Sequence, residues 1–192
     1  ERPEAEWVSS LKEALNRVEA GLPCLRAEMD LLMQQWIPVG FEPEMHLSAS
    51  YQEAIGQAYL TLHPNNYTMM EAMVHEFQHN KVNALMHLDP LLENAFSPLF
   101  SSPVRPDLRP IHGVLLAVHA FIPVAELYRQ LRAAGVPEVR QPDLKKRLKQ
   151  IVKGNHEGME VLREHGQWTE VGARFFAQLD ALDNRHFVEE CS

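Results

Sequence analysis

The stretch VHEFQHNK, residues 74–81, lies within an apolar run of helical periodicity that extends over residues 68–88. His75 and His79 are four residues apart, and residues at that spacing share one face of a helix. Both imidazoles can therefore reach a single metal ion, and the Glu76 carboxylate lies one position further round the helix. Because unpaired imidazoles are costly to bury in apolar surroundings, we favour a metal site over two core histidines. The stretch predicts a buried helix that carries metal ligands.

Helical periodicity continues on both sides of this stretch. We expect further helices over residues 4–20, 23–35, 111–134, 143–165 and 169–184. Between the second and third helices, residues 37–50 and 56–63 contain alternating polar and apolar positions, which is typical of short strands. We expect these two pieces to pair as an antiparallel ribbon. The predicted fold class is mainly α (α+β), a helical domain with a short antiparallel β ribbon beside the HExxH helix. Eight strands do not fit in the chain, so it is not a jelly roll.

The 192 residues are enough for one domain with a substantial core. We predict a single HExxH metal-binding domain over residues 1–192. Its parts are N-terminal helices (1–36), a metal-site core (37–134) and C-terminal helices (135–192). Residues 89–110 contain five prolines and separate two helices. Loops of that length are uncommon in compact domains and are usually functional, so we expect this one to contribute to the site.

Composition restricts the partners. The formal net charge is −8, which disfavours nucleic acid as a partner because phosphate neutralisation needs clustered Lys and Arg. No apolar run approaches the roughly 20 residues that span a bilayer, so we expect no membrane segment. Cys24 and Cys191 are too few for a disulfide framework, which predicts a reducing, cytoplasmic location. The oligomeric state stays open.

A catalytic metal normally has three protein ligands and one open position, so a third ligand is needed. Candidates are His112, His119 and Glu126, which follow one another at intervals of seven and lie on roughly one stripe of the helix 111–134. We favour His119, because Pro123 cannot bond the carbonyl of residue 119 and should kink the helix there. His112 and Glu126 remain alternatives.

Two chemistries compete for such a site. In a zinc metallopeptidase Glu76 would be the general base for a metal-activated water, and the ribbon would hold the peptide backbone. The extended HExxHxxGxxH pattern is absent, however, and the loop brings Arg105 and Arg109 to the start of the third-ligand helix. A paired arginine fork suits a dicarboxylate co-substrate, which a hydrolase does not need. Ligand type alone suits iron as well as zinc.

A third alternative is a non-catalytic, metal-stabilised interaction module, supported only by the helical remainder. Three further residues near the motif have weaker patterns. Glu71 lies one turn before His75 and is a candidate to orient its ring. His46 and His63 flank the ribbon, and we expect them on the surface.

The segments MVHEFQHNKVNAL, DPL and RPDLRPIHGVLLAVHAF, taken together, resemble the HExxH-type peptide β-hydroxylases that depend on 2-oxoglutarate. The resemblance covers about residues 45–132. It implies Fe(II) on His75 and His79 with His119 as third ligand, zinc being the alternative metal. It also implies that Arg105 or Arg109 holds the 2-oxoglutarate carboxylate. The expected activity is hydroxylation of a β-carbon in a ribosomally synthesised precursor peptide, with Glu76 in a positioning role.

Overall fold

The structure, a computed structural model, describes residues 3–100 and 107–191. Helices dominate it, so the predicted mainly α fold class is confirmed. The helices are α1 (Glu4–Gly21), α2 (Pro23–Leu32), α3 (Asn66–Leu88), α4 (Ile111–Ala133), α5 (Pro142–His165) and α6 (Glu170–Cys191), with a short 3-10 helix over Glu138–Arg140. Every predicted helix is present. The largest differences are that α2 ends earlier and that α6 continues past the expected end at residue 184.

Local chemistry accounts for these boundaries. Pro23 is the first residue of α2, where its fixed φ and missing N–H cost nothing. The start of α3 is capped by Asn65, whose side-chain oxygen accepts hydrogen bonds from the N–H groups of Tyr67 (2.8 Å) and Thr68 (3.4 Å). The end of α2 at Leu32 comes early because the chain enters a strand at Gln35.

A three-stranded sheet in the order β1-β3-β2 lies against α3. Its strands are β1 (Gln35–Phe41), β2 (Ser48–Ala49) and β3 (Gln57–Leu62). The expected antiparallel ribbon is present as β2 paired with β3. The addition of β1 in parallel to β3 was not expected. It arises because the segment between them, which contains β2, crosses back before β3 begins.

The long loop between α3 and α4 contains regular structure that the sequence did not predict. Leu99–Phe100 (β4) and Arg109–Pro110 (β5) pair as a short antiparallel ribbon just before α4. The backbone N–H of His112 also donates to the carbonyl of Ala95, which fixes the loop to the first turn of α4. The loop is therefore attached to the helix that follows it.

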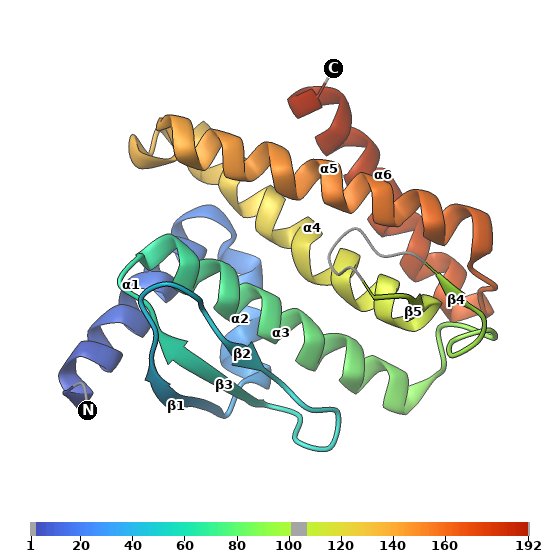
Figure 1. The fold of residues 1–192 in the computed structure, drawn as a ribbon, viewed down its shortest axis with the longest axis horizontal. Helices are drawn as coiled ribbons and strands as arrows, with labels where there is room; N and C mark the ends of the chain where they lie inside the picture. The colour runs from blue at the N-terminus through green and yellow to red at the C-terminus, as the bar shows by residue number, and fades with distance from the viewer. Residues whose placement is uncertain (1–2, 101–106, 192) are drawn as a thin grey trace.

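Helix α4 is the central element of the core. Figure 1 shows α3 between the sheet and α4, with α5 and α6 on the other side of α4. One hydrophobic cluster joins α1, β3 and α3 to the second half of α4, and another joins the first half of α4 to α5 and α6. Within the described part of the chain, α4 alone is long and apolar enough to cross a bilayer. No apolar segment of that length was expected. Since 61% of the most apolar window of α4 is buried inside the molecule, it has the environment of a core helix.

Candidate metal centre

His75 and His79 converge. Their Nε2 atoms are 2.8 Å apart, and their rings meet edge-on with centroids 4.3 Å apart. Burial, followed by the charge of His112, lowers the pKa of His79 to about 4. A neutral imidazole presents a lone pair, which is the form that binds a metal. The predicted pair therefore converges, and His79 is in the neutral form that can bind a metal, while the metal site itself stays a prediction.

Aromatic and charged side chains from α4 and α5 border this pair. The ring of His75 lies 4.8 Å from that of Phe121 on α4. One turn earlier on α3, the Glu71 carboxylate accepts hydrogen bonds from the Tyr128 hydroxyl (2.7 Å) and from Arg147 (2.6 Å). Glu71 thus ties α3 to both neighbouring helices, while its suggested role in orienting His75 stays a prediction.

Glu76 is attached to the sheet. Only 2% of its surface is exposed, and its two carboxylate oxygens accept hydrogen bonds from the hydroxyls of Ser48 (2.6 Å) and Ser50 (2.7 Å). Burial raises the pKa of Glu76, while the two serine hydrogen bonds act to lower it. The carboxylate therefore fastens the short edge strand β2 onto the motif helix. Sequence reasoning missed both serines, although their spacing of two places them on one face of a strand.

A second polar anchor lies one turn further along α3, and it was also missed. The Asn80 side chain accepts from the N–H of Gly56 (2.7 Å) and donates to the carbonyl of Gln57 (3.1 Å). Gly56 has φ 89°, and a Cβ there would come within 2.9 Å of the Leu32 carbonyl oxygen. A glycine is therefore required where the chain enters β3, directly beside the motif helix.

His119 is not brought into the pair. Among residues 3–100 and 107–191, no three His, Cys, Asp or Glu side chains form a group that could hold a metal ion. The α4 residue that contacts His75 is Phe121, which is rotated by roughly 200° from His119 around the helix. His119 is 5% exposed, and burial, followed by the charges of Lys81 and His79, lowers its pKa to about 3. The arrangement of the described side chains does not support His119 as the third ligand.

Of the two alternative ligands, Glu126 is engaged elsewhere, whereas the imidazole of His112 has only a ring contact among the described residues. Glu126 accepts hydrogen bonds from His186 (2.7 Å), Arg129 (2.7 Å) and Arg185 (3.1 Å), which ties α4 to α6. The hydrogen bond from His186 is the main reason that the pKa of Glu126 is lowered to about 2. His112 packs its ring 5.6 Å from that of Phe96 in the long loop. Of the three candidates, Glu126 is thus the most completely occupied by protein partners.

The arginine fork is only half described. Arg105 lies outside the described residues. Arg109, in β5, forms an ion pair with Asp107 at 3.2 Å and is partly exposed. Its assignment to a carboxylate co-substrate stays a prediction.

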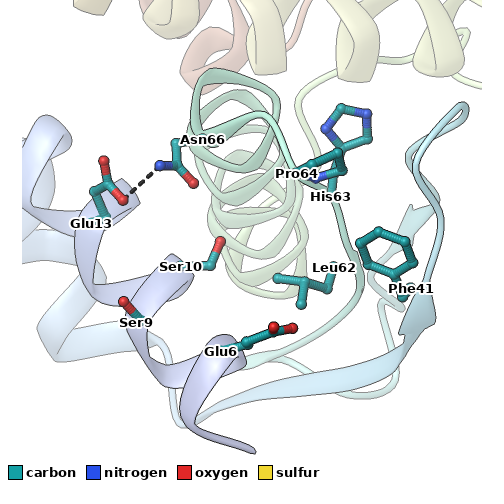
Figure 2. Close-up of a pocket in the computed structure, with 9 residues that line it drawn as sticks. All are labelled: Glu6, Ser9, Ser10, Glu13, Phe41, Leu62, His63, Pro64 and Asn66. Atoms are coloured by element: carbon teal, nitrogen blue, oxygen red, sulfur yellow. Dashed lines mark hydrogen bonds between the residues drawn. The ribbon is translucent and has the colours of Figure 1, made fainter. Parts of the chain in front are cut away.

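A separate hollow of about 300 Å³ lies at the other end of α3. Figure 2 shows Glu6, Ser9, Ser10 and Glu13 of α1 on one side of it, and Phe41, Leu62 and His63 on the other. Asn66, in the first turn of α3, donates to Glu13 at 2.6 Å. His75 is nine residues further along the helix, roughly 13 Å away at the rise of an α-helix. This hollow is therefore distinct from the imidazole pair.

In comparisons with known proteins, no family model and no curated protein matches this chain. The resemblance to peptide β-hydroxylases, which is drawn from the motifs quoted above, stays a prediction. Functional inference consequently depends on the geometry of the site itself.

Proposed function

We propose that this protein is a cytoplasmic Fe(II)- and 2-oxoglutarate-dependent dioxygenase that hydroxylates a β-carbon of a precursor peptide. The observation that carries the proposal is the convergence of the His75 and His79 Nε2 atoms, 2.8 Å apart on a helix next to an edge strand. Imidazole nitrogens suit iron, and such a site keeps positions open for co-substrate. The free, exposed thiols of Cys24 and Cys191 accord with a reducing compartment.

The fit to the metal is good at two positions. The described residues supply two converging imidazoles, and they supply no third His, Cys, Asp or Glu side chain grouped with them. When bound, iron would activate O₂ with 2-oxoglutarate as co-substrate, so that one oxygen atom would enter the peptide carbon and the other the succinate, with release of carbon dioxide. The task of His75 and His79 is to hold the ion. The apolar ring of Phe121 lies against His75 on the side that faces α4, and it limits how closely water can approach the imidazole from that side.

The sheet gives the peptide a place to bind. β2 is an edge strand, bonded to β3 on one side, and an extended peptide can add to such an edge through main-chain hydrogen bonds. Ser48 and Ser50 donate hydrogen bonds to Glu76, which is the residue after His75 in α3. These contacts hold the edge strand beside the motif helix. In this proposal Glu76 is a positioning residue, and a peptide on β2 passes beside the imidazole pair.

Zinc peptidase activity is the second candidate, and one observation favours it. Burial raises the pKa of Glu76, and a raised carboxyl pKa suits a general base. Against it, both oxygens of Glu76 already accept hydroxyl hydrogen bonds, which reduces their ability to take a proton from water. Hydroxylation needs no such base.

Glu76→Gln separates the two candidates. The amide keeps the shape and can still accept from one serine and donate to the other. A peptidase should lose about 10²–10⁴ in rate, whereas a hydroxylase should keep most of its turnover. The assay is mass spectrometry of a peptide library incubated with Fe(II), 2-oxoglutarate and oxygen. We expect the gain of one oxygen atom, coupled to succinate, with the backbone intact. Peptide fragments formed with zinc and without 2-oxoglutarate would contradict the proposal.

A further inference from the structure

A cavity of about 350 Å³ lies between α2, α3, α4 and α6, with His119 in its wall. Most of its lining is apolar, including Leu25, Leu85, Phe175 and Leu179. The volume is within the range of small-molecule sites, which are typically apolar with a few polar groups that orient the ligand. The cavity is absent from the proposed reaction, because neither His75 nor His79 is among the residues that line it.

Two buried polar side chains line this cavity without protein partners. His119 is 5% exposed, and its buried Nδ1 has no hydrogen-bond partner in the described part of the chain. Gln78 is 2% exposed, and its amide makes no hydrogen bond to another described side chain or backbone group. Buried polar groups are normally satisfied, and each one left unsatisfied is costly. Two such groups, from different helices and in one cavity, point to a ligand that pairs with them.

The charges around the cavity are already paired. Lys81 forms an ion pair with Glu28 at 2.5 Å, and both side chains are partly exposed. Glu126 is held by His186, Arg129 and Arg185. Among the described residues that line it, the cavity therefore offers an apolar wall, the imidazole of His119 and the amides of Gln78 and Gln178, while its charged side chains are all paired.

We propose that this cavity binds a small neutral molecule that has an apolar body and a head group able both to donate and to accept hydrogen bonds, such as a primary amide. The head pairs with His119 and Gln78, each of which can donate and accept. The apolar body lies against Phe175 and the leucines. This proposal does not rest on the proposed hydroxylation, because neither His75 nor His79 lines the cavity.

Three probes that share one apolar body test the head group: 4-phenylbutanamide, 4-phenylbutanoate and 4-phenylbutylamine. Each is titrated into the ¹⁵N-labelled chain, and backbone amide shifts are followed around the cavity. We expect saturable binding of the amide, at least tenfold tighter than that of either charged probe. Absence of saturable binding, a water-filled cavity only, would overturn the proposal. So would equal or tighter binding of a charged probe.

Variants locate the binding. His119→Phe and Gln78→Met each remove one polar partner with little change in shape, and each should weaken amide binding about tenfold. His75→Ala changes a residue of α3 that does not line the cavity, so this variant should leave the affinity for the amide unchanged. Two variants are made in case one of them fails to fold. A single variant whose backbone N–H spectrum is native is enough to decide the outcome. Unchanged affinity in a folded His119→Phe or Gln78→Met variant contradicts the proposal, as does a loss in His75→Ala.

Discussion

Gln78 and His79 are adjacent in the chain, yet they belong to two regions that differ in how their polar groups are satisfied. In the region of the imidazole pair, His79 meets His75, and the buried Glu76 accepts from two serines. In the cavity beyond, Gln78 and His119 are buried and lack hydrogen-bond partners among the described residues. The difference teaches that a histidine in apolar sequence indicates a metal ligand only where its nitrogens converge with others. Otherwise it indicates a different kind of site.

The largest expected effect tests the division between these regions. His75→Ala or His79→Ala should lower the affinity for Fe(II) or Zn²⁺ by a hundredfold or more, because each removes one of two converging ligands. His119→Ala should change it less than threefold. Calorimetry on the metal-free protein measures both, with His87→Ala as a control on the same helix, since His87 is exposed. A hundredfold loss in His119→Ala would merge the two regions and restore His119 as third ligand.

The next effect concerns the attachment of β2. Replacing Ser48 and Ser50 together by Ala leaves the buried Glu76 carboxylate without its two hydroxyl donors. Loss of both should reduce the free energy of unfolding by about 2–4 kcal/mol, since hydrogen bonds to charged groups are worth about 1.5–3 kcal/mol each and the losses are not fully additive. Urea unfolding measures it. The control is another serine, and Ser101 and Ser102 are not used because they lie outside the described residues. We choose Ser9→Ala, on α1, which should change the free energy of unfolding by less than about 0.5 kcal/mol.

Two buried histidines give a sharper comparison. His186 is 1% exposed and its Nε2 lies 2.7 Å from Glu126, whereas His119 is similarly buried and has no such partner. His186→Phe should destabilise the fold by about 1–2 kcal/mol, because it removes a charge-assisted hydrogen bond. His119→Phe should stabilise it by about 1 kcal/mol, because it removes an unsatisfied buried group. Thermal unfolding shows whether each variant is more or less stable than the wild type. Destabilisation by His119→Phe would indicate that the His119 imidazole has a hydrogen-bond partner.

The sequence predicts much of this architecture because periodicity reflects burial directly. The presence and order of the helices and the pairing of His75 with His79 follow from spacing alone, although the ends of α2 and α6 do not. The parallel placement of β1 does not, because strand pairing depends on where an intervening segment crosses, and short alternating pieces do not encode that. The antiparallel pairing of β2 and β3, which a short connection favours, was predictable.

The side of α4 that faces the motif was beyond sequence reasoning. His112, His119 and Glu126 lie on one stripe, as predicted, but a stripe does not state which neighbour it meets. Packing turns Phe121 toward His75 and leaves His119 in the cavity wall. The Ser48 and Ser50 contacts were in principle detectable, because two hydroxyls spaced by two residues next to a buried carboxylate form a recognisable pattern.

The smallest expected effect is a pH dependence of stability that comes from Glu76. Burial raises the folded-state pKa of Glu76 above its ordinary value of 4.5, so the folded protein retains this proton to a higher pH than the unfolded chain does. Ionisation of Glu76 therefore costs the fold nothing below pH 4.5, and the cost grows as pH rises through the raised pKa. Glu76→Gln cannot ionise, so the stability of wild type relative to this variant should fall as pH rises from 4.5 toward 8, by about 1 kcal/mol or less. Urea unfolding of both proteins across that range measures the difference, and titrating groups common to both cancel. A relative stability that rises with pH would mean that the serine hydrogen bonds outweigh burial and hold the carboxylate ionised.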